Sequence, residues 1–349
     1  MHTDSAKRFD RGKLKGLQTQ AVVLPEGELV RSRPFQDRGP LPLLVEPAVP
    51  DLDLADWAAG NRAFVDESLA RHGAVLFRGF GVTRPEDFER FASAVCRELF
   101  DENGEHPRES VSGNVYTPVF YPSGKQLLWH NENSFNHRWP SKILFCCARP
   151  ADSGGETPLV DSREVWRRVD PQVRRRFEEK GVMYQRHYGG GPGLDWQTVF
   201  RTSDPAVVEA RCAAEGFEVL WKEGGAVLRT RCVRPAVIAH PVTGEPCWFN
   251  QAQHWHIACL DPETRASIVE SYREEDYPRH CYFGDGSTIE DSVMAEILGI
   301  YRELEVVFPW LPGDVVLVDN VMAAHGRNPF AGPRKILVAL GDMRSYDEV

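Results

Sequence analysis

The sequence predicts a mainly β protein of the α+β class, built as one closed β domain with helices around it. Strand-like apolar runs dominate the middle and the end of the 349-residue chain, and hydrophobic residues make up 42% of it, enough for a sizeable core. Two candidate metal-binding segments, at residues 130–132 and at His325, lie far apart in the sequence. A closed β domain brings such distant strands together more simply than two separate domains do.

Composition and charge exclude several classes of partner. The net charge is −10 and the pI is near 5.6, so a nucleic acid finds no broad basic surface. Residues 1–16 are polar and contain no apolar run typical of a signal peptide or a membrane span. We therefore expect a soluble cytoplasmic protein that binds neither nucleic acid nor membrane.

The 8 cysteines indicate buried thiols and no disulfide framework. They form no C-x-x-C pair, and several lie in apolar runs, as small buried side chains do in a reducing compartment. Cys146 and Cys147 are adjacent in a strand-like run, so we expect them to face opposite sides of one strand.

The domain organisation is predicted from composition shifts along the chain. Residues 1–50 are rich in Pro and charge and are expected to form an extended N-terminal arm. Residues 51–349 are expected to form a single domain. Within it, residues 188–234 are loosely patterned, and such an insertion between core strands is either a lid over a substrate or a solvated loop.

The first elements after the arm are a helix, a strand and a second helix. Residues 61–72 have helical spacing, with Asn61 as a cap and Gly73 as a stop. A short strand is expected over residues 74–80. The Thr-x-x-Glu pattern at residues 83–86, with a proline in the first turn, predicts a capping box at the start of the next helix.

The rest of the chain contains further strands and three clear helices. Asp161 and Asp170 are each expected to cap a helix, and residues 289–304 carry apolar residues along one helical face. Strands are predicted over residues 142–148, at the end of the run 152–160, and over 315–319 and 335–342.

His130 and Glu132 form the first half of a candidate metal site. Residues two apart in an extended segment point to the same face, so the imidazole and the carboxylate can reach one cation. His325, which follows the buried strand pattern at 315–319, offers a third ligand. Two His and one carboxylate with open positions form the facial triad of non-haem Fe(II) oxygenases. Both segments lack thiolates, which argues against a closed structural zinc site.

His254 and His256 form a rival same-face pair. No carboxylate stands in strict register with them, so we interpret them as pocket or core histidines. The nearby amides of Asn250, Gln251 and Gln253 suit a substrate pocket, and equally a satisfied polar network.

Several motifs in order along the chain carry a family resemblance. They are residues 73–80, Trp-His-Asn-Glu at 129–132, Ser-Gly-Gly-Glu-Thr-Pro at 153–158, Trp-Phe-Asn-Gln at 248–251, and residues 313–334 around His325. Together they resemble the TauD/TfdA group of Fe(II)/2-oxoglutarate-dependent dioxygenases, in a clavaminate-synthase-like branch. The resemblance implies a double-stranded β-helix, or jelly-roll, that uses Fe(II), 2-oxoglutarate and O2.

The resemblance also implies roles for individual residues. His130, Glu132 and His325 would hold the iron, and the carboxylate of Glu132 argues against a halogenase. Thr157 and Arg334 would bind the distal carboxylate of 2-oxoglutarate, because a guanidinium fork and a nearby hydroxyl can donate to it together.

Arg344 is the alternative to Arg334 in that role. Asn133, Asn250, Gln251 and Arg344 are the candidate substrate contacts.

The activity implied by the resemblance is hydroxylation of an unactivated C–H bond, with release of succinate and CO2. The substrate is expected to be an amino acid or an amino-acid-derived intermediate of secondary metabolism, free or bound to a carrier protein. Desaturation, epoxidation or oxidative cyclisation is the alternative outcome at the same iron site. Two other classes are a non-catalytic jelly-roll that binds ligands or regulates, and a zinc-dependent hydrolase with Glu132 beside a metal-bound water.

Overall fold

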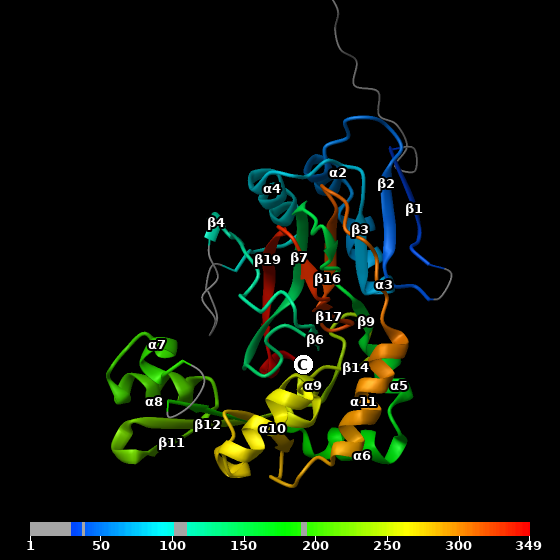
Figure 1. Ribbon diagram of the computed structural model, residues 1–349. Helices are drawn as coiled ribbons and strands as arrows, with labels where there is room; N and C mark the ends of the chain where they lie inside the picture. The colour runs from blue at the N-terminus through cyan, green and yellow to red at the C-terminus, as the bar shows by residue number, and fades with distance from the viewer. Residues whose placement is uncertain (1–28, 37–38, 101–109, 190–193) are drawn as a thin grey trace, which may run out of the picture.

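The computed structural model describes residues 29–36, 39–100, 110–189 and 194–349. Its largest element is an eight-stranded sheet with the order β1-β2-β3-β16-β7-β19-β5-β4 (Figure 1). The strands of this sheet are β1 (Val30–Pro34), β2 (Leu43–Pro47), β3 (Ala74–Phe77), β4 (Ser110–Ser112), β5 (Val115–Tyr116), β7 (Arg138–Arg149), β16 (Val315–Asp319) and β19 (Lys335–Ser345). Within the predicted arm, β1 and β2 thus form one edge of the sheet, while residues 1–28 lie outside the described part.

Three helices cover one face of the large sheet: α2 (Leu54–Gly60), α3 (Arg62–His72) and α4 (Pro85–Val95). They share a core with Leu144 and Cys146 of β7. The alternate β7 residues, among them Phe145 and Cys147, belong to a separate apolar cluster on the other face of the sheet. Cys146 and Cys147 therefore face opposite sides, as the sequence predicts.

A three-stranded sheet with the order β6-β17-β9 packs against that other face. Its strands are β6 (Leu127–His130), β9 (Leu159–Asp161) and β17 (Ala323–Arg327). Leu159 and Ala323 of this sheet share the cluster with Phe145 and Cys147. Two sheets, whose strands are antiparallel except for the parallel pair β2–β3, thus enclose one apolar interior, and residues from positions 130 and 325 meet in the smaller sheet.

A four-stranded sheet, β11-β12-β10-β15, lies beyond the smaller sheet (Figure 1). Its strands are β10 (Val182–Tyr188), β11 (Glu218–Lys222), β12 (Val227–Arg234) and β15 (Arg279–Phe283). On β12, the Cys232 thiol donates to the carbonyl oxygen of Phe135 over 3.4 Å, so one face of this sheet packs on the segment that follows β6.

The remaining elements connect and cover these sheets. Short strands are β8 (Ser153–Gly154), β13 (Val237–Ala239), β14 (Pro246–Trp248) and β18 (Phe330–Ala331). Helices are α5 (Ser162–Arg168), α6 (Pro171–Lys180), α7 (Trp196–Phe200), α8 (Pro205–Ala214), α9 (Ala252–Trp255), α10 (Pro262–Ser271) and α11 (Asp291–Leu304). No helix in the described ranges is long and apolar enough to cross a membrane.

The helix ends agree with the sequence in part. Asp161 and Asp170 accept backbone N–H bonds at the starts of α5 and α6, and Gly73 ends α3 in the left-handed region at φ 74. The predicted capping box of α4 is wrong, because the helix starts one residue later, with Arg84 as its N-cap, and no side chain caps it.

Asn61 also differs from its predicted role. Its amide donates to the carbonyl oxygen of Trp57 and does not cap α3, because the unpredicted helix α2 ends directly before α3.

A buried histidine pair lies between α9, β15 and α11. The rings of His256 and His280 have centroids 4.3 Å apart, and both side chains are buried. Burial lowers the pKa of His256 to about 4 and that of His280 to about 3, although the Asp291 carboxylate acts in the opposite direction on both. Both rings are therefore neutral in the folded protein at pH 7.

This pair predicts a loss of stability in mild acid. Below the unfolded-state pKa of about 6.5 the unfolded chain binds protons that the folded chain excludes, so stability falls as the pH drops from about 6.5 towards the folded-state values. Between pH 7 and pH 5, His280→Gln should lose about 2 kcal/mol less stability than the wild type, measured by urea unfolding. The variant His72→Gln, at a partly exposed position, is the control. Equal losses in the wild type and His280→Gln would contradict the prediction.

Candidate metal centre

His130 and His325 come together through strand pairing. They are direct cross-strand partners on β6 and β17, and β17 is held on its other edge by β9. Gly326 permits this close approach, because a Cβ at that position would lie 2.7 Å from the carbonyl oxygen of Leu127. Two histidines that are remote in sequence are thus fixed by one antiparallel ladder.

Glu132 lies just after β6 and is held by a side chain from the other end of the protein. The amide oxygen of Asn320 accepts the Glu132 N–H over 2.7 Å, and the amide nitrogen donates to the Glu132 carbonyl oxygen over 2.9 Å. The same nitrogen donates to the carbonyl oxygen of Pro140. Asn320 is fully buried and acts as a two-bond clasp on the ligand-bearing peptide.

The three predicted ligands converge at one point. One Glu132 carboxylate oxygen lies 3.8 Å from Nε2 of His130 and 3.6 Å from Nε2 of His325, and one ligand atom from each residue lies within 4.8 Å of the others. Nδ1 of His130 donates to the carbonyl oxygen of Leu128 over 2.9 Å, which leaves Nε2 with its lone pair available to a metal.

The surroundings of the triad are aromatic. The ring of Phe145 lies 5.1 Å from that of His325, and the ring of His254 lies 5.2 Å from that of His130. In the described ranges, the three-residue metal cluster contains neither His254 nor His256. His254 thus lines the site beside a ligand, and His256 belongs to the buried pair with His280.

Arg334 contacts the segment that leads through Thr157 into β9. Nε of Arg334 donates to the carbonyl oxygen of Gly155 over 3.0 Å, two residues before Thr157. Gly155 has φ +76, and a Cβ there would lie 3.0 Å from the Arg334 side chain. Thr157 leads into β9, whose Leu159 is the cross-strand partner of His325.

Arg334 is partly buried and forms no ion pair within 4.0 Å in the part of the chain that the structure describes. Burial and, to a smaller extent, the charge of Arg327 lower the pKa of Arg334 to about 10, while the Cys147 thiol and the Glu156 carboxylate act in the opposite direction. Its guanidinium lies 5.4 Å from the ring centroid of Phe330. Its Nη groups, in contrast to Nε, have no recorded acceptor among the described residues. An anion with two acceptor oxygens fits this fork.

The predicted substrate contacts occupy different environments. Asn133 follows Glu132 in the left-handed region at φ 57 and is partly exposed. Asn250 and Gln251 are buried. The Asn250 amide donates to the carbonyl oxygen of Ala236 and accepts the Ala252 N–H.

Gln251 and Gln253 hold the backbone on either side of His130. The Gln251 amide donates to the carbonyl oxygen of Asn131, and the Gln253 amide donates to that of Trp129, each over 2.7 Å. These bonds form the polar network that the sequence offered as the alternative to a substrate pocket, and Oε1 of Gln253 has no hydrogen-bond partner among the described residues. Contact of Asn250 or Gln251 with a substrate stays a prediction.

Arg334 and Arg344 lie at opposite ends of the β7–β19 ladder. Arg344 pairs in register with Trp139, whereas Lys335, next to Arg334, pairs with Arg149. Arg344 approaches Glu348 at 3.6 Å and lines a cavity of about 540 Å³ with Lys142 and Asp319. The contact with Gly155 favours Arg334 for the carboxylate-binding role.

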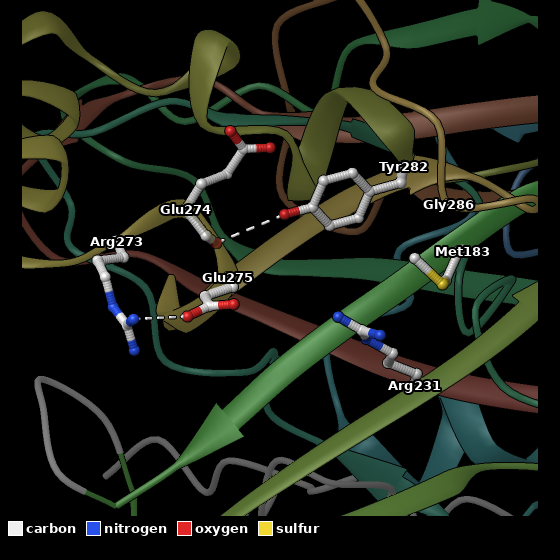
Figure 2. A pocket seen from close by; sticks show the side chains of 7 residues that line it. All are labelled: Met183, Arg231, Arg273, Glu274, Glu275, Tyr282 and Gly286. Carbon is white, nitrogen blue, oxygen red and sulfur yellow. Dashed lines mark hydrogen bonds and ion pairs between the residues drawn. The ribbon is translucent and has the colours of Figure 1, made fainter.

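A cavity of about 450 Å³ lies on the far side of the four-stranded sheet (Figure 2). It is lined by Met183, Arg231, Arg273, Glu274, Glu275, Tyr282 and Gly286. Along β10 and β12, Met183 and Arg231 alternate with Tyr184 and Cys232, which face the metal-bearing segment. This cavity is therefore separate from the triad.

Sequence reasoning missed Asn320 and Arg327 as supporting residues. Asn320 follows the buried strand β16 in a turn, where an Asn looks like an ordinary turn residue. Arg327 donates to the carbonyl oxygens of Tyr121, Pro122 and Lys125, so it ties that loop to β17. The position of Arg327, two residues after the metal ligand His325, could have indicated a supporting role.

Asn320 supplies a direct test of how Glu132 is positioned. Asn320→Asp keeps the acceptor for the Glu132 N–H but removes both donors and places a carboxylate beside two carbonyl oxygens, so Fe(II) affinity should fall about 10-fold or more. Asn61→Asp is the matched control, because Asn61 donates to one remote carbonyl oxygen. Anaerobic Fe(II) titration measures the affinity. Wild-type affinity in folded Asn320→Asp would contradict the role.

Comparisons with known proteins agree with this geometry. Residues 37–340 match the taurine catabolism dioxygenase TauD, TfdA family. The dapdiamide synthesis protein DdaC of Enterobacter agglomerans is 34% identical over 312 residues, covering 89% of this chain and 94% of that protein. A clavaminate synthase-like protein of Arabidopsis thaliana is 30% identical over 345 residues, covering 91% of this chain and 98% of that protein.

A solved structure supports the same fold. PvcB from Pseudomonas aeruginosa matches with a TM-score of 0.54 at 16% identity, covering 91% of this chain and 93% of that chain. The large and small sheets are accordingly those of a TauD-like dioxygenase, which has a jelly-roll core. The chain belongs to the TauD/TfdA family and is an Fe(II)/2-oxoglutarate-dependent dioxygenase that uses O2.

Proposed function

We propose that His130, Glu132 and His325 hold the Fe(II) ion, and that Thr157 and Arg334 bind the distal carboxylate of 2-oxoglutarate. The observation that carries the second assignment is the Arg334 guanidinium, a partly buried cation with a lowered pKa beside Gly155. A carboxylate supplies two acceptors for its fork. Two imidazoles and one carboxylate are the donor set that suits Fe(II) in an open site.

When bound, the cofactors couple decarboxylation of 2-oxoglutarate to succinate and CO2 with oxidation of an unactivated C–H bond. The protein orients the three ligands through the β6–β17 ladder and the Asn320 clasp. Phe145 and its apolar cluster keep the interior beside the triad dry. Asn133 is partly exposed and directly follows the metal ligand Glu132 in the sequence, and we propose it as a substrate contact.

We propose hydroxylation of an amino acid or an amino-acid-derived intermediate of secondary metabolism, free or presented by a carrier protein. Two likenesses support this class. DdaC is a dapdiamide synthesis protein, and PvcB is an Fe, α-ketoglutarate-dependent oxygenase from an isonitrile synthetic pathway. Desaturation, epoxidation or oxidative cyclisation at the same centre is the alternative reaction.

Residues 188–234 are the proposed lid, although residues 190–193 lie outside the described part. The support is the contact between β12 and the segment after Glu132, because Arg234 donates to the carbonyl oxygen of Phe135 over 3.1 Å. A substrate that reaches the triad past Phe135 would touch this sheet.

The cofactor assignment predicts a spectroscopic signature. Anaerobic addition of Fe(II) and 2-oxoglutarate to the folded protein should produce a weak visible charge-transfer band, because the keto acid chelates a ferrous ion held by three protein ligands. His130→Ala and His325→Ala should each abolish the band and succinate formation. The circular dichroism of each variant controls for folding. Substantial turnover in either folded variant would refute its ligand role.

The Arg334 assignment has a matched control, Arg344, on the strand β19 that begins directly after Arg334. Arg334→Ala should raise the 2-oxoglutarate concentration needed for half-maximal succinate release by about 100-fold, since it removes charge-assisted hydrogen bonds to a buried carboxylate. Arg344→Ala should leave that concentration unchanged. The reverse result would transfer the role to Arg344.

The substrate class is tested by a screen for substrate-stimulated succinate release. Free amino acids and the same amino acids loaded on a carrier protein are compared, and the product mass is measured for each. A mass gain of one oxygen supports hydroxylation or epoxidation, and loss of two hydrogens supports desaturation or cyclisation. Stimulation by non-amino-acid substrates alone would overturn the proposed class.

A further inference from the structure

The hydroxyl of Thr157 has a protein partner that suggests how it is used. The indole N–H of Trp310 donates to Oγ1 of Thr157 over 3.2 Å. Thr157 is 2% exposed and Trp310 is 6% exposed, so water does not compete for this bond. It is the hydrogen bond recorded for that hydroxyl within the described residues.

An indole N–H can only donate, so this bond fixes the direction of the hydroxyl. A threonine hydroxyl has one proton and two lone pairs. The Trp310 N–H occupies a lone pair, so the proton of Thr157 must point elsewhere, and in the described ranges no protein acceptor is recorded for it. Nearby, the Arg334 side chain also presents donors, with its Nε on the carbonyl oxygen of Gly155.

The position of Trp310 relative to Thr157 is set by backbone pairing. Val306 and Leu159 exchange both of their backbone hydrogen bonds, at 2.8 and 3.0 Å. The segment that carries Trp310 is therefore attached to the strand that follows Thr157. The ring of Trp310 also packs edge-on against that of Phe308, with centroids 5.3 Å apart. The donor is held in place before any ligand binds.

We propose that Trp310 is a positioning residue that orients the Thr157 hydroxyl as a donor to the distal carboxylate of the 2-oxo acid. The inference rests on the proposed binding of 2-oxoglutarate by Thr157 and Arg334 and adds a source of selectivity to it. Trp310 makes the site prefer 2-oxo acids with a second, distal carboxylate over those that end in a methyl group. It does so without touching the cofactor itself.

The test compares two 2-oxo acids of the same chain length. Trp310→Phe keeps the aromatic packing and removes the donor. Binding of 2-oxoglutarate and of 2-oxopentanoate, which lacks the distal carboxylate, is measured anaerobically from the Fe(II) charge-transfer band. In Trp310→Phe the Kd for 2-oxoglutarate should rise about fivefold, as expected for the loss of one oriented hydrogen bond, while the Kd for 2-oxopentanoate stays the same.

A double-mutant cycle separates orientation from packing. Thr157→Val should weaken 2-oxoglutarate binding at least as much as Trp310→Phe, and Trp310→Phe added to Thr157→Val should cause no further loss. Trp57→Phe is the matched control. Trp57 is a buried tryptophan on the core-facing side of α2, and its Nε1 has no hydrogen-bond partner in the described structure. Its substitution should leave both Kd values unchanged.

The outcomes are distinguishable. Equal weakening of both acids by Trp310→Phe, additive losses in the double variant, or unchanged 2-oxoglutarate binding would each overturn the role of Trp310 while leaving the proposed function standing. Absence of the band in wild-type protein with 2-oxoglutarate would overturn the proposed function and this inference with it.

A second measurement needs no substitution at Trp310. In the Zn(II)-loaded wild-type protein, the indole N–H resonance that shifts in Thr157→Val belongs to the donor of this bond. That resonance should shift on addition of 2-oxoglutarate and stay in place with 2-oxopentanoate. An indole N–H resonance whose chemical shift is unchanged by both acids would contradict the proposal.

Discussion

The metal centre depends on the clasp between Asn320 and the backbone of Glu132. Glu132 lies beyond the end of β6, where no strand ladder holds it, and the Asn320 amide supplies the donor and the acceptor that a neighbouring strand would otherwise provide. The clasp is buried, so leaving either peptide group unpaired would carry the desolvation cost of that group. One side chain thus links the segment of the first His ligand to the segment of the second.

The charges of the protein divide into paired and unpaired arginines. Arg78 lies 2.7 Å from the buried Asp314, and Arg163 lies between Asp161 and Glu245 with its pKa raised by those partners. Arg334 has a lowered pKa beside the metal centre. A buried cation is costly unless it is paired. The contrast supports the proposal that a ligand carboxylate is the partner of Arg334.

The two faces of β7 pack against different parts of the protein. Residues on one face pack against α2, α3 and α4, and residues on the other face line the cluster that reaches Phe145 and the metal ligands. Gln251 and Gln253 then hold the strand of His130 from the far side. The Gln251 and Gln253 amides therefore support the backbone around His130, whereas Asn133 and His254 are partly exposed.

The sequence by itself identified the three candidate metal ligands, the mainly β fold class and several of the core strands, because apolar strand patterns and ligand spacing are local signals. The roles of Thr157 and Arg334 were implied by the family resemblance alone. The sequence also identified the Asp161 and Asp170 caps, and it failed at Thr83 and Asn61. Those failures arose because α2 was not predicted and Arg84 became the cap of α4. The tertiary structure alone decided that Asn320 holds Glu132, that Trp310 meets Thr157 and that the Gln251 amide serves the frame. Each of these contacts joins residues about 100 or more positions apart, and their partners are backbone groups or single polar atoms that no local pattern encodes.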